Sequence, residues 1–414
     1  MHNHTSFSEE SPASSWSVVL ERDQDELVAK IEGYSNNIPS DFAFYLMRGK
    51  DLIEKRWYSE KMSVRFSQPS LPGDYHAIGF VRTKPDLTPE FKKSAVFLKA
   101  GYPLYDLQQW KQSVFDYPSD GEWPEKELLR NGIHRFAIGA ENTLDIRLDG
   151  IERLRDNGVV LVCFGGAIPK RSTKSAPFFS GIGVAGKLGV PVLSVSDPSL
   201  GLSQSLALGW YAGYKGFSDL PKRVAALLDA FADRYQSSFV IFGGSGGGFA
   251  TIAVLGWLET RSTAVVWNPQ ISIGRYSITE VTKYLDIAFP LAERSVAATL
   301  ESRLQSAGIM HDLVFDRGPY THPLLYLQNI SDRHHVEQHA RPYALSFQAK
   351  RISKTVFAGE GELAFWFGDW GRGHAVPPSS MILSILDDLI SGKAPKALAL
   401  QLEREEGHDL QFDL

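Results

Sequence analysis

A glycine-rich segment between two apolar stretches constrains the fold of this chain more than any other feature. Gly243, Ser245 and Gly247 fit the pattern G-x-S-x-G. The strand-like run Phe239–Phe242 precedes them, and the helix-like run Thr251–Glu259 follows. A serine on a turn that joins a strand directly to a helix adopts strained backbone angles, so side chains two residues to either side would collide. Such a turn lifts the hydroxyl above a sheet and aims it at the amino end of the helix. The segment therefore predicts that Ser245 is a nucleophile.

Two other interpretations of these glycines fit less well. A flexible linker would not be flanked, without a break, by an apolar strand pattern and an apolar helix pattern. A nucleotide-binding loop needs G-x-G-x-x-G or a glycine-rich loop that ends in lysine and then serine or threonine. Phe249 stands where a glycine would be required, and no lysine follows. The sequence therefore favours a catalytic turn.

Residues 151–395 show the pattern of an α/β catalytic domain. Short apolar runs alternate with amphipathic stretches such as Leu220–Tyr235. This alternation is typical of a mostly parallel sheet covered by helices on both faces. Residues 396–414 are charged and are expected to form a mobile tail. The expected strands are Val159–Phe164, Pro191–Val195, Phe239–Phe242, Ala264–Trp267, Pro323–Gln328 and Thr355–Ala358.

The first 150 residues follow a different pattern. Residues 1–14 are rich in serine and glutamate and are expected to be a disordered tail. Residues 15–100 contain short strand-like segments separated by turn residues, which predicts a small β-sandwich. Residues 101–150 are irregular and rich in aromatic residues, and we expect them to connect the two domains.

We call the turn at Gly243–Gly247, with Ser245 at its centre, the elbow. Together with the alternating strands and helices, it resembles the α/β-hydrolase superfamily over the C-terminal two-thirds of the chain. The resemblance implies an α/β-hydrolase fold, here preceded by an N-terminal β-sandwich domain. It also implies a catalytic triad in the chain order nucleophile, acid and histidine. The acid is then expected on a loop after a later strand, and the histidine on a loop near the end of the domain.

Asp332 is the expected acid, because it follows the predicted strand Pro323–Gln328 by a short loop. An aspartate that caps a turn is common, and Asp369 is an alternative acid. His374 is the expected base. Glycines at positions 371 and 373 let its loop fold over the site, and the predicted helix Ser379–Ile390 follows it.

Three further histidines stand at helical spacing just after Asp332, namely His334, His335 and His339. They are alternatives to His374, or they line the pocket or bind a metal. No His/Glu spacing of a known metal motif is present. We therefore expect neither a metal nor a cofactor.

The resemblance also assigns the groups that would face a developing negative charge. Phe164-Gly165-Gly166-Ala167 resembles the glycine-rich oxyanion loop that esterases carry after the equivalent strand. The N–H groups of Gly166 or Ala167, together with that of Gly246, are the expected donors. An ordinary turn between a strand and a helix would look the same. The expected substrate-binding residues are Gly244, Trp210, Tyr211 and Trp370. Their aromatic rings would stack on sugar rings, line an apolar acyl pocket or belong to the core.

Composition restricts the remaining function classes. The net charge of −5, without a basic cluster, argues against a nucleic-acid partner. The single cysteine, Cys163, excludes an internal disulfide and is expected on a buried strand. No apolar run has the length of a transmembrane segment and no signal peptide is evident, so we expect a soluble, cytoplasmic protein. A homo-oligomer is compatible with the sequence.

The acyl chemistry follows from a second resemblance. The chain is similar to bacterial O-acetyltransferases and esterases of surface-polysaccharide and glycoprotein pathways that carry an N-terminal β-sandwich. The order of motifs carries this similarity: Phe164–Ala167, Asp197–Ser199, Trp210-Tyr211, the Ser245 elbow, Trp267–Gln270, Asp332 and His374.

This similarity implies a serine hydrolase of O-acyl esters, with O-acetyl as the expected group and a small-molecule or glycan ester as the substrate. The first alternative is an O-acetyltransferase that modifies a bacterial surface polysaccharide or a glycoprotein glycan, with acetyl-CoA as donor in that case alone. A lid formed by Ile271–His322 would favour transfer because it would exclude water. The second alternative is a non-catalytic scaffold in a polysaccharide or export complex.

Overall fold

The structure is a computed structural model that describes most of the chain. The described residues are 16–23, 26–35, 39–67, 73–84, 88–94, 97–99, 104–119, 122–138, 142–155, 158–290, 299–319, 321–406 and 412–414. By its internal contacts the chain divides into two compact units, residues 1–103 and residues 104–414. The expected disordered tail, residues 1–14, lies outside the described residues.

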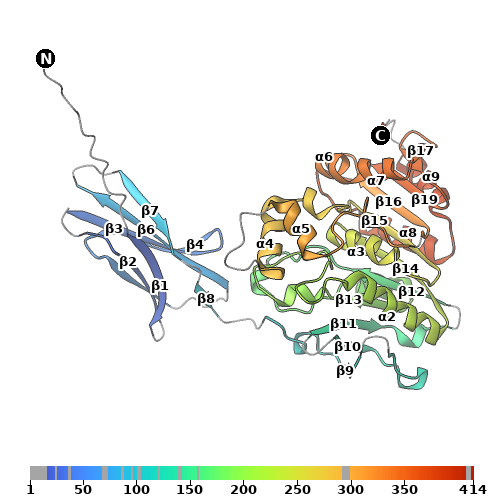
Figure 1. Ribbon diagram of the computed structural model, residues 1–414, viewed down its shortest axis with the longest axis horizontal. Helices are drawn as coiled ribbons and strands as arrows, with labels where there is room; N and C mark the ends of the chain where they lie inside the picture. Colours follow the sequence, from blue (N-terminus) through green and yellow to red (C-terminus); the bar gives the residue numbers. More distant parts are fainter. Residues whose placement is uncertain are drawn as a thin grey trace, which may run out of the picture. The chain divides into compact units, whose positions relative to one another are not determined.

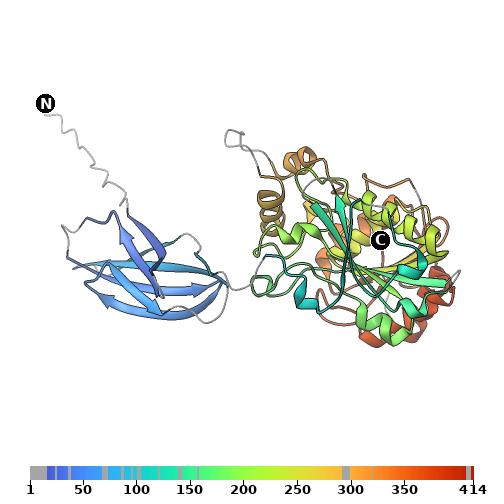
Figure 2. The ribbon, with the colours of Figure 1, turned by 90° about the horizontal axis from the view of Figure 1, so that it is seen from below.

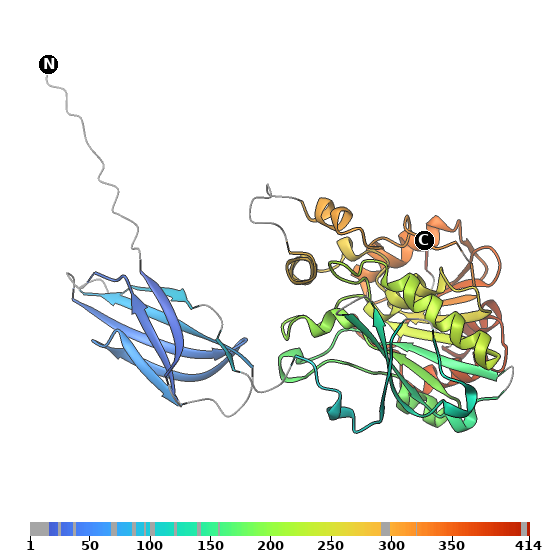
Figure 3. The same ribbon diagram turned by 60° about the horizontal axis from the view of Figure 1, so that its bottom comes forward.

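Two antiparallel sheets form the N-terminal unit, and they lie face to face (Figure 3). The smaller sheet has the order β1-β2-β5, with β1 (Ser17–Asp23), β2 (Glu26–Glu32) and β5 (Ser63–Ser67). The larger sheet has the order β4-β3-β6-β7, with β8 paired to β6. Its strands are β3 (Ser40–Arg48), β4 (Asp51–Ser59), β6 (Gly73–Thr83), β7 (Pro89–Lys93) and β8 (Phe97–Lys99).

The core of this unit lies between the two sheets. Side chains alternate between the two faces of a strand. Leu27 and Ala29 of β2 therefore point inward together, and they share a buried cluster with Phe42, Phe44 and Leu46 of β3. This is the packing of a β-sandwich. The predicted β-sandwich is confirmed.

The C-terminal unit is organised around an eleven-stranded sheet with the order β17-β18-β19-β16-β15-β14-β12-β13-β11-β10-β9 (Figure 1). The six strands from β13 to β19 in this order are parallel, whereas β11 is antiparallel to both β10 and β13. The strands are β9 (Val114–Tyr117), β10 (Gly132–Ile138), β11 (Asn142–Asp149), β12 (Gly158–Phe164), β13 (Val192–Val195), β14 (Ser237–Gly244), β15 (Ser262–Trp267), β16 (Leu324–Asn329), β17 (Lys350–Arg351), β18 (Val356–Ala358) and β19 (Leu363–Gly368).

Helices cover both faces of this sheet (Figure 2). α2 (Leu220–Tyr235) and α3 (Gly246–Leu255) belong to the buried cluster on one face. α1 (Ile182–Leu188), α8 (Ser379–Ile390) and α9 (Pro395–Glu406) belong to the cluster on the other. The predicted mostly parallel, helix-covered sheet is confirmed. The other helical segments are α4 (Ile278–Ala288), α5 (Leu300–Ala307), α6 (Arg333–His335), the π-helical turn η7 (Val336–Ala340) and α7 (Arg341–Ser346).

Short 3₁₀ turns join several of these elements. They are η1 (Gln108–Trp110), η2 (Lys126–Leu128), η3 (Ile151–Arg153), η4 (Arg171–Thr173), η5 (Pro198–Gly201) and η6 (Ile273–Arg275). Among the helices that the structure describes, none has the length and apolar character needed to cross a membrane.

Helix α2 shows how the sequence specifies these elements. Pro221 stands in its first turn, where the missing N–H costs nothing. Val224, Leu228 and Phe231 recur at helical spacing and are completely buried, and burial of such a side chain contributes about 1.5–3 kcal/mol. Gln236 ends the helix in the left-handed conformation. The helix has the predicted bounds.

Residues 101–150 were expected to form an irregular connector, and this expectation is wrong for the part that the structure describes. Strands β9, β10 and β11 extend the large sheet at one edge. Phe136 and Leu144 point into the core, whereas Arg135 and Asp145 form an ion pair at 3.1 Å on the opposite face. Charged residues such as Arg135 and Asp145 interrupt the apolar residues of β10 and β11, and for this reason the two strands were not recognised in the sequence.

The expected mobile tail at residues 396–414 is also wrong over its first part, because α9 extends to Glu406. Leu398, Ala399 and Leu402 are buried against the sheet. Glu403 accepts hydrogen bonds from the backbone N–H and the hydroxyl of Thr355. The charged residues of this segment lie on the outer face of an amphipathic helix.

Candidate active site

Ser245 stands at the turn between β14 and α3, with φ 56° and ψ −122°. Its N–H donates to the carbonyl oxygen of Trp267 at 3.0 Å. A Cβ on Gly243 would lie 2.4 Å from the carbonyl oxygen of Gly247, and one on Gly247 would lie 2.3 Å from that of Phe164. Such close approaches exclude any side chain at either position. The strained serine and its two required glycines are therefore where the sequence pattern placed them.

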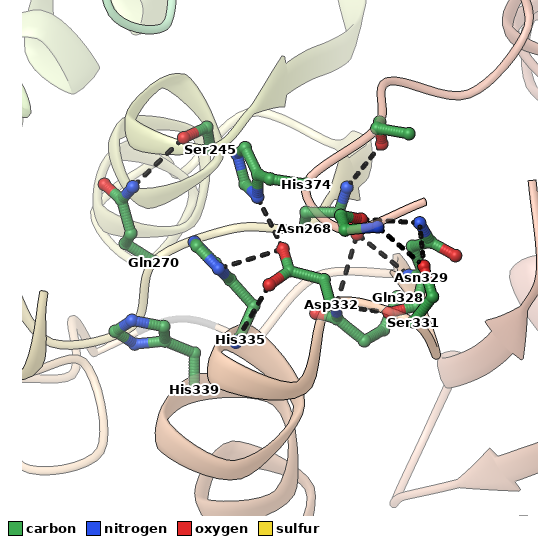
Figure 4. A network of polar contacts seen from close by, with 12 residues as sticks. Ser245, Asn268, Gln270, Gln328, Asn329, Ser331, Asp332, His335, His339 and His374 are labelled. Atoms are coloured by element: carbon green, nitrogen blue, oxygen red, sulfur yellow. Dashed lines mark hydrogen bonds and ion pairs between the residues drawn. The ribbon is translucent and has the colours of Figure 1, made fainter. Parts of the chain in front are cut away.

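Asp332 and His374 come from the ends of two neighbouring strands, β16 and β19. His374 Nδ1 lies 2.6 Å from Asp332 Oδ2 and donates to it, because a carboxylate only accepts. The second ring nitrogen of His374 then carries a free electron pair. Figure 4 shows the His374 ring between Asp332 and Ser245, with this second nitrogen on the side of Ser245. The three side chains therefore lie in the order Asp332, His374 and Ser245 that the predicted triad has.

The alternative acid, Asp369, is exposed at the end of β19 and takes no part in this arrangement. The competing histidines have separate places. His334 is exposed, whereas His335 and His339 are buried beside Asp332. His339 Nδ1 accepts a hydrogen bond from the Ile271 N–H at 3.2 Å, so it supports the backbone after β15.

Three of the described residues have ligand atoms close enough together to share a metal ion. These atoms of Asp332, His335 and His374 lie within 4.8 Å of one another. An ion there would occupy a ring nitrogen of His374 and a carboxylate oxygen of Asp332, and the acid–base arrangement needs both groups free of metal. Metal binding and an acid–base role for His374 therefore exclude each other.

Four polar side chains hold the loop that carries His374. Asn268 Nδ2 donates to the carbonyl oxygen of Ala375 at 2.8 Å, and the Trp370 indole N–H donates to the same oxygen at 2.8 Å. Asn329 Nδ2 donates to the carbonyl oxygens of residues 371 and 373, both at 2.7 Å. Ser331 accepts a hydrogen bond from the N–H of residue 373 at 2.8 Å. The expected glycines at 371 and 373 both have positive φ, which the bend of this loop requires.

The expected oxyanion loop packs against the elbow. A Cβ on Gly166 would lie 3.2 Å from the carbonyl oxygen of Gly244 and 3.9 Å from Ser245 Cβ. Gly246 is the first residue of α3, where a backbone N–H has no acceptor inside the helix. Ala167 is exposed. Gly166 thus lies beside Ser245 and Gly246 follows it in the chain, and their role as oxyanion donors stays a prediction.

Comparison of the sequence with family models and with curated proteins gave no match. Among solved structures, the chain is similar to a prolyl endopeptidase with a TM-score of 0.41 and 13% identity, over 92% of this chain and 52% of that one. It therefore spans about half of that protein's length. A Pyrococcus horikoshii acylaminoacyl peptidase matches with a TM-score of 0.42 and 12% identity, over 92% of this chain and 71% of the other. An S-formylglutathione hydrolase from Agrobacterium tumefaciens matches with a TM-score of 0.38 and 14% identity, over 63% of this chain and 93% of the other.

The strand order decides the fold. Read along the sheet as β10-β11-β13-β12-β14-β15-β16-β19, the order places the serine turn after β14, Asp332 after β16 and His374 after β19. The chain has the α/β-hydrolase fold. In this fold the carboxyl ends of the parallel strands form one edge of the sheet, and every residue discussed above for the site lies on that edge or on a loop that follows it.

Electrostatics at this edge favour an ionised Asp332. Burial raises the pKa of its carboxyl, but the hydrogen bonds from His335 and then His374 outweigh burial. The net pKa lies well below its ordinary value, so Asp332 is an anion throughout the physiological range. Burial lowers the pKa of His335, whose Nδ1 lies 3.0 Å from Asp332 Oδ2. His335 is therefore neutral, and its ring packs against that of His374 with centroids 4.2 Å apart.

Three of the expected substrate-binding residues have structural positions instead. Trp210 is completely buried and Tyr211 almost so. The Tyr211 hydroxyl donates to the Val195 carbonyl and accepts from the Gly165 N–H at 2.9 Å, so it holds the oxyanion loop from below. The Gly244 Cα faces the Trp267 indole, which a Cβ would approach to 2.0 Å. The prediction that substrate stacks on Trp210 and Tyr211 is wrong, because their rings are packed inside the core. Trp370 is half-buried and remains a predicted contact.

One polar residue at the site was not predicted as such. Gln270 is completely buried, and its Nε2 donates to Ser245 Oγ at 3.0 Å (Figure 4). The sequence offered a signal in the polar residues at the ends of consecutive strands, Asn268 and Gln270 after β15 and Asn329 at the end of β16. In a parallel sheet such residues meet at one edge.

Proposed function

We propose that this protein is a serine hydrolase that cleaves carboxylic esters through an acyl-enzyme. The observation that carries the proposal is the strained Ser245 at the β14–α3 turn beside the His374 ring. His374 Nδ1 is hydrogen-bonded to Asp332, and the second ring nitrogen lies on the side of Ser245. A strained backbone conformation costs about 1–3 kcal/mol and persists where it is needed for function. A scaffold without activity would have no use for it.

The reaction follows from the donors and acceptors in place. His374 takes the proton of Ser245 as Oγ attacks the ester carbon, and Asp332 offsets the charge of the resulting imidazolium. The carbonyl oxygen becomes an oxyanion that the Gly246 and Gly166 N–H groups would stabilise. Loss of one such donor typically costs about 3–4 kcal/mol of barrier. His374 then protonates the leaving alcohol, and it activates the water that hydrolyses the acyl-enzyme.

A small acyl group, with acetyl as the first choice, suits the surroundings of Ser245. Leu208 is buried and packs directly against the amino end of α3, where a Cβ on Gly246 would lie 2.3 Å from its Cδ1. Leu208 therefore occupies space beside the nucleophile that a long acyl chain would need. Trp370 is the described aromatic residue of the His374 loop that is not fully buried, and it supports a carbohydrate as the alcohol part of the ester.

Labelling with a fluorophosphonate probe, read by intact mass, tests the nucleophile. We expect a single adduct on the native chain and none on Ser245→Ala. The alanine variant keeps the turn and loses the hydroxyl, and thermal unfolding of both proteins would check that the fold is retained. A folded native chain without an adduct would contradict the proposal and favour a binding protein.

Turnover of p-nitrophenyl acetate, butyrate and octanoate then tests the acyl group. We expect the specificity constant to fall as the acyl chain grows, and Leu208→Ala to reduce that fall. A sugar acceptor added to the acetate reaction distinguishes the two fates of the acyl-enzyme. An O-acetylated sugar in the mass spectrum would indicate transfer, and acetate alone would indicate hydrolysis.

A further inference from the structure

Gln270 is held by its backbone, by the backbone of the next residue and by its side chain. Its backbone N–H donates to the carbonyl oxygen of Ser245 at 3.2 Å, and the next N–H, that of Ile271, donates to His339 Nδ1. Its Oε1 accepts the indole N–H of Trp210 at 2.6 Å. Trp210 is itself completely buried, with its ring against those of Tyr276 and Tyr284. The amide therefore has one position, with Nε2 directed at Ser245 Oγ.

The chemistry of the partners also fixes which end of the amide faces Ser245. An indole N–H only donates, so the atom that it meets must be the amide oxygen. The nitrogen then faces Oγ, and an amide nitrogen only donates. Ser245 Oγ accepts from Gln270 and cannot give its own proton to it. That proton is left for His374, on the other side of Ser245 in Figure 4.

We propose that Gln270 is a further catalytic residue of the site, a side-chain donor to the nucleophile oxygen. This inference rests on the proposed function. During acylation, the Gln270 N–H stabilises the electron pair on Oγ as the proton passes to His374. During deacylation, the C–Oγ bond breaks and its electron pair returns to Oγ. The same N–H stabilises that pair until His374 returns the proton. Gln270 therefore acts in both acylation and deacylation, because Ser245 Oγ takes part in both.

The test is the kinetics of fluorophosphonate labelling at Ser245, because these separate the rate of bond formation, kinact, from probe binding, KI. In Gln270→Leu the donor is absent, and we expect kinact to fall about 10- to 100-fold with KI changed less than about twofold. In Gln270→Glu the shape and the acceptor for Trp210 are kept, but the carboxylate accepts the hydroxyl proton. We expect a larger fall in kinact, because the hydroxyl then turns away from His374.

Two variants of the neighbouring cluster serve as references. Trp210→Phe removes the N–H that fixes the Gln270 amide. The amide can then rotate and exchange its oxygen and nitrogen, so we expect a smaller loss of kinact than in Gln270→Leu. Tyr284→Phe removes a buried hydroxyl that donates to the Gly213 carbonyl and touches neither Gln270 nor Ser245, so kinact should be unchanged. Thermal unfolding of each variant shows whether the fold is retained.

The outcomes separate this inference from the proposed function. If the native chain is labelled at Ser245 and both folded Gln270 variants are labelled at the native rate, the role of Gln270 is disproved while the nucleophile stands. A higher kinact in Gln270→Leu would also overturn it, because the amide would then restrain the serine. A native chain that is not labelled would overturn both proposals. Should Gln270→Leu not fold, Gln270→Glu decides alone.

Discussion

Asn268 Nδ2 donates to the carbonyl oxygen of Ala375 at 2.8 Å, and this bond joins the end of β15 to the loop of His374. The other end of the same amide accepts the backbone N–H of Asn329 at 2.8 Å. Asn268 is buried and has a φ of 42°, a left-handed conformation that asparagine tolerates better than most residues. One side chain thus spans three strand ends and sets the distance from the base to the sheet.

Replacement of Asn268 tests this clamp. Asn268→Ala leaves the Asn329 N–H without its acceptor and removes one of the two acceptors of the Gln328 amide, and a buried donor without a partner costs about 1–3 kcal/mol. We expect the free energy of unfolding, measured with urea, to fall by about 2–4 kcal/mol, and the labelling rate of Ser245 to fall with it. Asn268→Gly should be about 1 kcal/mol more stable than Asn268→Ala. Both variants lack the side-chain hydrogen bonds, but glycine adopts the left-handed conformation without strain. Native labelling by a folded Asn268→Ala would show that the loop holds without the clamp.

Gly247 should tolerate no side chain. In Gly247→Ala the new methyl group would lie 2.3 Å from the Phe164 carbonyl oxygen and 2.9 Å from the carbonyl carbon of Gly165, both backbone atoms. The oxyanion loop must then move away from the elbow. We expect a loss of about 3 kcal/mol or more in unfolding free energy and a loss of labelling.

The matched control for Gly247→Ala is Gly183→Ala on α1, where a methyl group meets nothing within 4 Å. That variant should be neutral or about 0.5–1 kcal/mol more stable, since alanine favours a helix over glycine. Equal effects of the two substitutions would contradict the steric account of the elbow.

His134 makes the large sheet sensitive to acid. Burial lowers its pKa to about 4, although a backbone contact with Arg130 works in the opposite direction. An unfolded histidine has a pKa of about 6.5. The folded state therefore disfavours the charged ring. Its contribution to stability is complete above pH of about 6.5 and is lost as the pH falls through the folded pKa, by about 3 kcal/mol in total.

Urea unfolding of the native chain and of His134→Gln between pH 7 and pH 4 measures this effect. The glutamine can still face the Tyr117 hydroxyl and the Arg130 carbonyl, which lie 2.8 and 3.0 Å from the two ring nitrogens. We expect the variant to be less stable at pH 7 and to lose less stability on acidification. His335 and His339 are present in both proteins and cancel in the difference. Parallel curves would show that His134 does not titrate in this range.

His335 is expected to support Asp332 rather than to replace His374. His335→Phe keeps a ring against His374 and removes the nitrogen that lies 3.0 Å from Asp332. The pKa of Asp332 then rises toward its ordinary value, and kcat/KM should fall about tenfold, as for the loss of one hydrogen bond to a charged group. A loss as large as that of His374→Ala would mean that the two histidines had been assigned the wrong roles.

The same variant has a signature in acid. Because the folded pKa of Asp332 is depressed, its stabilising contribution is present above pH of about 4 and is lost as the pH falls further. In His335→Phe this loss should be smaller, because less of the depression remains. Urea midpoints at pH 5, 4 and 3 give the comparison.

The elements with one regular apolar pattern over their whole length were predictable from the sequence. Val159–Phe164 and Leu220–Tyr235 each carry a single period over their whole length. The elbow was predictable for another reason, since a strained serine turn between a strand and a helix requires glycines two residues to either side, at positions 243 and 247. In contrast, β11 alternates Asp145 and Arg147 with apolar residues. Asp145 pairs with Arg135 of the neighbouring strand, and no local pattern shows that pairing in advance, whereas Arg147 pairs with Asp149 of its own strand.

The site was predictable where the chain order carries it and not where packing does. Ser245, Asp332 and His374 follow β14, β16 and β19, and this chain order is the one from which they were predicted. Gln270 and His335 are ordinary polar residues until the sheet brings their strand ends together. For Trp210 the sequence suggested a substrate contact that the structure does not show. A tryptophan near a glycine-rich loop resembles a substrate platform, but its ring lies beneath the site and only its N–H serves it, through Gln270.

The antiparallel pairing of β11 with β13 has a consequence for how this protein can be divided. A shortened chain that began near Gly150 would retain Ser245, Asp332 and His374, but the β13 side of the sheet would present unpaired N–H and C=O groups. Bare strand edges recruit further strands. We expect such a fragment to associate with itself, so the smallest part of the C-terminal unit that folds alone should include β9, β10 and β11.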